Sequence, residues 1–125
     1  MNYYRLLSLA SKKNINIIEV KNGDRVYFDK FTYIDILWPK IIQINENILN
    51  NNSIVMMLNY KRFRMLFTGD IEMEAEDKIV KLYSNSNYLE ADVLKVAHHG
   101  SKTSSCEEFL KLLKPKIALI GVRRK

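Results

Sequence analysis

The chain has 125 residues, of which 47% are hydrophobic, and it contains one cysteine. This length fits one compact domain and is too short for two. The hydrophobic fraction excludes a disordered chain, and the lone cysteine excludes a disulfide scaffold or a cysteine-rich zinc module. The formal net charge of +6 includes Arg123, Arg124 and Lys125 at the C-terminal end. We therefore interpret the charge first as a solvated surface, with a nucleic-acid contact at Lys61, Arg62 and Arg64 as an alternative.

The first part of the chain is expected to form a helix and a β-hairpin. Residues 3–13 carry apolar side chains at helical spacing. Residues 15–20 and 25–29 are rich in β-forming side chains, and they flank Asn22-Gly23, a pair that favours tight hairpin turns. A further strand over 32–37 should end before proline, and residues 40–52 have the least regular pattern. No apolar run reaches the ~20 residues of a membrane-spanning helix.

The second part predicts a more regular arrangement. Residues 53–60 and 62–68 predict two strands joined by a tight connection. The pattern that follows is typical of a β-α-β-α-β unit, with parallel strands over 62–68, 91–97 and 116–122 and helices over 71–83 and 105–114. We expect the strand over 91–97 to be covered on both faces, because its apolar run is nearly continuous, and the strand over 116–122 to be a last buried strand.

Polar residues follow two of these parallel strands. Asp70 comes directly after the first, and His98 and His99 come after the second. Parallel strands have their carboxyl ends at one edge of the sheet, where open α/β sheets bind ligands. A carboxylate and an imidazole, both ordinary ligands of zinc, manganese or iron, are therefore expected to lie close together.

Simpler structural roles remain possible for these residues. Asp70 could cap the N-terminus of the helix that follows it, and the two histidines could bond to backbone groups. A second helix starting near Ser104 or Ser105 would have a glutamate three residues further on, which is the pattern of a capping box. Cys106, at that helix start, could have a lowered pKa, although a structural thiol is the simpler interpretation.

Taken together, three segments resemble a known family. They are Asn52-Ser53-Ile54-Val55, then Leu66-Phe67-Thr68-Gly69-Asp70, then Leu94-Lys95-Val96-Ala97-His98-His99-Gly100-Ser101 followed by Ser104-Ser105. In this order they are similar to the C-terminal half of a metallo-β-lactamase-fold domain of the ComEC type. That branch includes the hydrolase domain of the bacterial DNA-uptake (competence) channel and soluble relatives. The resemblance covers roughly residues 15–122.

The resemblance implies an α/β fold and a set of site residues. Residues 1–125 would form a single partial domain, the C-terminal half of a four-layer αββα sandwich. Asp70 would bridge two divalent metal ions, zinc or manganese, and we assign Asp70 and His98 to catalysis. His99 is the favoured late metal ligand, with His98 contacting the substrate or the second metal ion. The substrate loop would consist of the residues after the histidines: Gly100, Ser101, Thr103 and Ser104.

The sequence also departs from this family. The upstream signature His-x-(His/Asp)-x-Asp-His, which supplies most of the metal ligands, is absent, because His98 and His99 are the only histidines. We therefore expect a fragment that is inactive alone and whose partner is the missing N-terminal half. In the intact domain the substrate would be a phosphoester, nucleic acid included.

Two further expectations concern association and location. The sheet face that would meet the missing half is expected to be exposed and to favour self-association. The compartment would be cytoplasmic for a complete soluble chain, and the extracytoplasmic face for a piece of a membrane-anchored parent. The alternative function is a non-catalytic remnant or interaction domain of the same fold.

Overall fold

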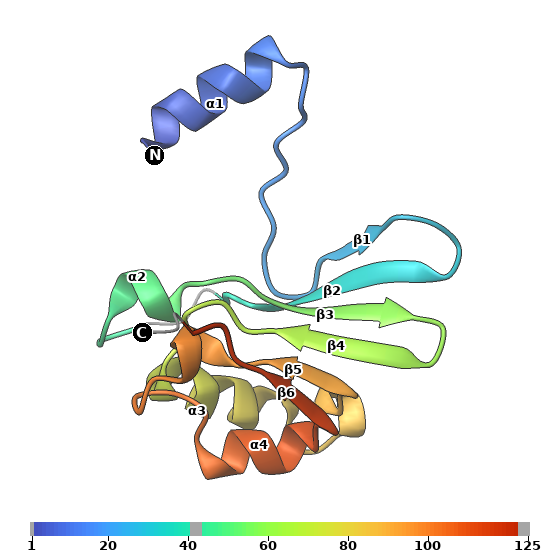
Figure 1. Ribbon diagram of the computed structural model, residues 1–125, viewed down its shortest axis with the longest axis vertical. Coiled ribbons are helices and arrows are strands. Elements are labelled where there is room, and N and C mark those ends of the chain that lie inside the picture. Colours follow the sequence, from blue (N-terminus) through green and yellow to red (C-terminus); the bar gives the residue numbers. More distant parts are fainter. Residues whose placement is uncertain (1, 41–43, 123–125) are drawn as a thin grey trace.

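The structure is a computed structural model that describes residues 2–40 and 44–122. It contains a six-stranded mixed sheet with helices packed on one face (Figure 1). The strands lie in chain order across the sheet: β1 (Arg25–Tyr27), β2 (Thr32–Trp38), β3 (Val55–Tyr60), β4 (Phe63–Phe67), β5 (Val93–Lys95) and β6 (Ile117–Leu119). The helices are α1 (Tyr3–Lys12), α2 (Ile48–Asn51), α3 (Met73–Tyr83) and α4 (Glu107–Leu113), with short 3₁₀ turns η1 (Asn87–Leu89) and η2 (Ala97–Gly100).

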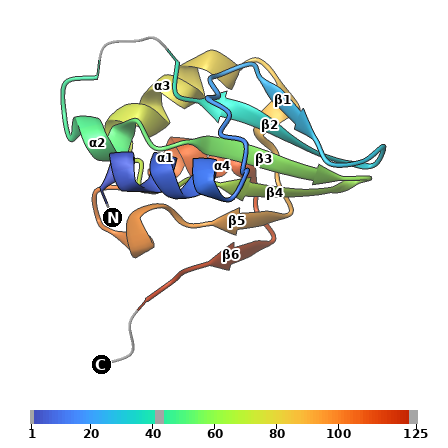
Figure 2. The ribbon, with the colours of Figure 1, turned by 90° about the horizontal axis from the view of Figure 1, so that it is seen from above.

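The second half of the chain has the predicted β-α-β-α-β order. β1 to β4 pair antiparallel, whereas β4, β5 and β6 pair parallel through the crossovers that contain α3 and α4. The carboxyl ends of β4 and β5 consequently lie at the same edge of the sheet. Figure 2 shows β1 and β6 as the two outer strands.

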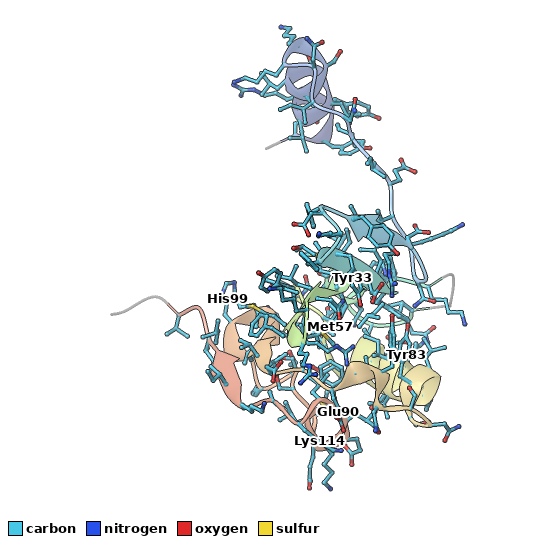
Figure 3. The ribbon with its side chains drawn as sticks, turned by 90° about the vertical axis from the view of Figure 1, so that its right-hand side faces the viewer. Tyr33, Met57, Tyr83, Glu90, His99 and Lys114 are labelled. Atoms are coloured by element: carbon cyan, nitrogen blue, oxygen red, sulfur yellow. The ribbon has the colours of Figure 1, made fainter. Side chains whose placement is uncertain are left out.

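The hydrophobic core lies between the sheet and the two helices α3 and α4. The register aligns Met57 with Leu66 and Leu66 with Leu94, so these side chains form one row on the helix-covered face. All three are almost completely buried, and Figure 3 shows Met57 in the middle of the molecule. From the helices, Ile79 and Phe109 pack against this row. Burying each such side chain contributes about 1.5–3 kcal/mol.

The opposite face of the sheet carries a second set of apolar rows, which no described element covers. One row runs through Leu58, Met65, Val93 and Ile117, which are paired in register and alternate with the core row. Ile117 is 55% exposed. The expectations for these two strands are therefore wrong. Val93 and Lys95 of β5 are only partly buried, because the open side of the sheet has no second layer among the described residues. β6 is an outer strand of the sheet and is exposed along its length. We call this surface the open face.

Helix α1 forms as predicted but stands away from the sheet, on the side of the open face (Figure 1). The side chain of Asn2 caps it by accepting a hydrogen bond from the backbone N–H of Tyr4 at 3.0 Å. Its apolar side chains Tyr3, Leu6 and Leu9 are largely exposed, and Ala10 is its one buried residue. Amphipathic spacing thus produced a helix whose apolar stripe has no cover among the described residues.

The predicted hairpin between residues 15–20 and 25–29 is wrong. Residues 15–20 form no strand, and β1 pairs with β2 instead. The turn at Asn22-Gly23 is present, with Gly23 at φ +94°, but its polar groups bond to β2. Gly23 N–H donates to Ile36 at 2.9 Å, and the Asn22 amide donates to the carbonyl of Leu37 at 2.7 Å.

Helix α4 is capped from another helix instead of by the predicted capping box. Its N-cap residue is Cys106, whose side chain makes no cap. The fully buried carboxylate of Glu76, from α3, accepts the backbone N–H groups of Ser105 at 2.6 Å and Cys106 at 2.7 Å. Burial, followed by the proximity of Glu76, raises the pKa of the Cys106 thiol to about 11, so the lowered pKa considered for a cysteine at this helix start is wrong.

Candidate functional site

The corner after β4 and the loop after β5 meet directly. The Thr68 hydroxyl donates to the carbonyl of Lys95 at 2.6 Å, and the backbone N–H of His98 donates to the carbonyl of Gly69 at 3.2 Å. These two segments, whose bonded residues are 27 and 29 positions apart in sequence, therefore form a single junction at the carboxyl edge of the parallel strands. This is the arrangement that the strand order predicted.

Gly69 allows the chain to turn sharply at this corner. It has φ +56°, and a Cβ atom at this position would lie 2.7 Å from the Cβ of Ser53. The Ser53 hydroxyl accepts the backbone N–H of Asp70 at 3.2 Å. The close approach of Ser53, which precedes β3, to the corner thus requires a residue without a side chain at position 69.

Asp70 does not cap the helix that follows. The N-cap of α3 is Glu72, and Asp70 lies two residues earlier in the turn. Asp70 is exposed, and its carboxylate makes no hydrogen bond or ion pair within the described part of the chain. The capping explanation for this aspartate is therefore wrong, and its carboxylate is accessible beside the His98 backbone.

The two histidines point to different partners. His98 Nδ1 lies 3.1 Å from Oε1 of Glu72, whereas His99 Nδ1 lies 2.8 Å from the carbonyl oxygen of Gly121, beyond β6. Figure 3 shows His99 on the opposite side of the molecule from Tyr83. A carbonyl oxygen only accepts hydrogen bonds, so Nδ1 of His99 carries a proton.

The residue that sequence reasoning missed is Glu72. Its side chain is 10% exposed and accepts hydrogen bonds from the side-chain amides of Asn47 and Asn50. Asn47 is the N-cap residue of α2, and Asn50 lies within that helix. These amides, that of Asn47 first, together with the nearby His98 imidazole, lower the pKa of Glu72 below its ordinary value. No motif in the sequence singles out Glu72, because its partners Asn47, Asn50 and His98 are more than 20 residues away along the chain.

The asparagine-rich segment before β3 is better ordered than expected. Residues 41–43 lie outside the described residues, but Asn51 is buried and its side-chain oxygen accepts the backbone N–H of Glu72 at 2.7 Å. Trp38 donates its indole N–H to the carbonyl of Asn51 at 2.6 Å. Glu74 accepts the backbone N–H groups of Asn45 and Glu46. Glu72, the N-cap residue of α3, and Glu74, in its first turn, thus hold this segment against the site.

In the loop after the histidines, the hydroxyl groups bond within the protein. Ser104 is buried and donates to the carbonyls of Ala97 and Ser101, at 3.3 and 3.1 Å. The hydroxyls of Ser101 and Thr103 lie 3.0 Å apart. Gly100 has φ +76°, and a Cβ there would lie 3.3 Å from Ile120. These contacts fix the path of the loop beside His98.

The candidate ligands do not form a metal site by themselves. Within residues 2–40 and 44–122, no group of three His, Cys, Asp or Glu side chains is arranged to hold a metal ion. A catalytic zinc needs about three protein ligands. Asp70 and His98 flank one junction, but the ring of His99 is directed to Gly121, so this donor set is incomplete.

The basic residues lie at the opposite edge of the sheet from this junction. Arg62 and Arg64 are at the start of β4, near Lys114 and Lys116. Lys114 donates to Glu90 at 2.5 Å (Figure 3), and Lys116 donates to Asp92 at 2.8 Å. Because acidic partners sit among these cations, the charge pattern favours a solvated surface.

Comparison with known proteins gives relatives but no family model, since none matches the chain. The chain is 35% identical over 117 residues to ComE operon protein 3 of Bacillus subtilis (strain 168), a match that covers 94% of this chain and 14% of that protein. It is 35% identical over 75 residues to Recombination protein 2 of Haemophilus influenzae, covering 60% of this chain and 9% of the relative. It is 34% identical over 70 residues to Competence protein ComA of Neisseria gonorrhoeae, a match that covers 56% of this chain and 10% of that protein.

The names of these relatives indicate a competence family of the ComEC type, at modest identity. The chain spans about a seventh or less of the length of these relatives. Within the part of the chain that the structure describes, no helix has the length and apolarity needed to cross a membrane.

Proposed function

We propose that this chain has a competence-related role as the C-terminal half of a metallo-β-lactamase-type hydrolase domain. In the intact domain, the substrate would be a phosphoester, nucleic acid included. The chain alone would be inactive, because the donors at its junction are too few to hold a metal ion. Zinc or manganese ions would be held by Asp70 and His98 together with ligands from the missing half.

The single observation that carries this proposal is the contact between the two loops. The backbone N–H of His98 donates to the carbonyl of Gly69, next to the exposed Asp70, and this contact supports a site formed by a carboxylate and an imidazole at one edge of the parallel strands. Ligands bind at this edge in open α/β sheets. The names of the relatives independently support a competence role. Lewis-acid activation of water is the chemistry that bound divalent ions would supply.

The exposed apolar side chains of the open face support the part of the proposal that concerns a binding partner. Its rows of apolar side chains and the apolar stripe of α1 are both uncovered by described residues. Large exposed apolar patches mark interaction surfaces. We propose that the missing half of the domain covers the open face, and that in its absence copies of this chain self-associate there.

Hydrolysis of single-stranded DNA and of bis(p-nitrophenyl) phosphate, with Mn²⁺ or Zn²⁺ added, tests the proposal. The 125-residue chain should cleave neither substrate faster than its Asp70→Ala variant. ComE operon protein 3 should cleave, and replacement of its residue aligned with Asp70 by asparagine should abolish that cleavage. Cleavage by the short chain that depends on Asp70 would refute its inactivity. If the relative cleaves equally well after its residue aligned with Asp70 is replaced by asparagine, the assignment of the site is refuted.

A non-catalytic domain of the same fold is the second candidate. The incomplete donor set favours it, as does the use of the loop hydroxyls in internal hydrogen bonds. Metal analysis separates the two functions: a non-catalytic domain predicts no stoichiometric metal in either the short chain or its longer relative, whereas the hydrolase predicts metal in the relative.

A further inference from the structure

Glu72 is held in one orientation by the segment that contains α2. Asn47 and Asn50 donate side-chain hydrogen bonds to its two carboxylate oxygens. Its own backbone N–H donates to the side chain of Asn51 at 2.7 Å. A carboxylate bonded from both oxygens, on a residue whose backbone is also bonded, has little freedom to turn toward another partner.

The imidazole of His98 presents a buried nitrogen to this carboxylate. Nδ1 is buried and makes no well-aligned hydrogen bond within the described residues, although Oε1 of Glu72 lies 3.1 Å away. Leaving a buried polar group without a partner is costly. An ionised carboxylate only accepts hydrogen bonds, so a proton on Nδ1 is what satisfies both groups.

The rest of the His98 ring is more accessible. The side chain is 34% exposed although Nδ1 itself is buried, so its solvent-accessible surface belongs to atoms other than Nδ1. If Nδ1 carries the proton, Nε2 of the neutral ring has a free lone pair. Partners of this kind fix the tautomer of a histidine and thereby determine which nitrogen can act as a ligand or base.

We propose that Glu72 is a positioning residue that acts through His98. It holds the ring with the proton on Nδ1 and leaves Nε2 as the free nitrogen at the junction where Asp70 lies. This assignment rests on the proposed function only in one respect, the role of Nε2 as a metal ligand or base. The Asn-rich segment before β3 contributes by fixing the carboxylate.

Nitrogen NMR of the two histidines in the 125-residue chain tests the assignment, at about pH 8, above the ordinary histidine pKa of ~6.5. We expect His98 to be the Nδ1–H tautomer in the wild type and in Glu72→Gln, whose amide oxygen can still accept. In Glu72→Ala the Nδ1 and Nε2 resonances should move toward the opposite tautomer. If that variant does not fold, Glu72→Met keeps the side-chain volume and also lacks an acceptor.

Two internal controls belong to the experiment. His99 bonds to the main chain at Gly121, so its tautomer should not change in any variant at Glu72. Glu74→Gln alters the other acidic residue that holds the same segment, through Asn45 and Glu46, and it should leave His98 unchanged. An Nε2–H tautomer of His98 in the wild type, or no change in folded Glu72→Ala or Glu72→Met, would overturn the assignment.

The tautomer experiment is independent of any hydrolysis assay. If the His98 tautomer follows Glu72 and the longer relative has no hydrolase activity, the assignment of Glu72 stands and the proposed function fails. If the tautomer does not follow Glu72 and the relative is an active hydrolase, the proposed function stands and the assignment fails.

Discussion

Replacing Glu76 by alanine should destabilise the protein by about 3 kcal/mol. The fully buried carboxylate accepts two backbone N–H groups at 2.6 and 2.7 Å, from Ser105 and Cys106. A hydrogen bond to a charged group is worth about 1.5–3 kcal/mol, which gives about 3–6 kcal/mol for the pair. We expect the lower end, because both donor residues are only partly buried and water can reach them once the side chain is removed.

Urea unfolding of the wild type, Glu76→Ala, Glu76→Gln and Asp77→Ala measures this loss. Glutamine keeps one acceptor and loses the charge, so it should cost about half as much as alanine. Asp77 is the next residue of α3 and is exposed, so its replacement should change the free energy of unfolding by less than about 0.5 kcal/mol. The reasoning would be refuted if Glu76→Ala and Asp77→Ala had the same effect.

Two further predictions concern the corner and the acid limit of stability. Gly69→Ala should cost at least about 2 kcal/mol in urea unfolding, because alanine is strained at φ +56° and its Cβ would clash with Ser53; a loss below about 0.5 kcal/mol would contradict the close approach. The pKa of Glu74 is lowered from 4.5 to about 2, mainly by the backbone N–H groups of Glu46 and Asn45. Its contribution to stability is therefore complete above about pH 4.5 and is lost as the pH falls to about 2. The stability difference between wild type and Glu74→Gln should shrink over that range, and a difference independent of pH would argue against it.

Local signals predicted the second half of the chain well. The helical spacing of apolar residues after Asp70 is a property of the segment itself, and so is the apolar run that contains Leu94. Because crossovers between parallel strands are almost always right-handed and short, these signals sufficed to place β4, α3, β5 and α4. The contact between Gly69 and His98 followed from the parallel strand order alone.

The errors arose where the partner of a group is distant in sequence. Asn22-Gly23 predicts a turn, but the sequence around the turn does not say which strand its polar groups will meet, and that strand is β2. The serines before α4 match a capping box. The backbone N–H groups of Ser105 and Cys106 instead donate to the buried carboxylate of Glu76, about 30 residues away in sequence. The exposure of β6 depends on its place at the edge of the sheet and on what covers the open face, and neither can be determined from the apolar run itself.

The backbone of His98 and His99 is strained, because both residues have positive φ angles. Within the described chain, His98 and His99 are the only adjacent non-glycine residues with positive φ, at +44° and +54°. Each such residue costs roughly 1–2 kcal/mol. Strained backbone persists where surrounding contacts over-determine it, and it concentrates at functional sites. Here the contacts are the bond from His98 to Gly69 and that between His99 and Gly121. A loop needed only to connect β5 to α4 would have had no reason to retain this conformation, so the strain supports a function at the junction.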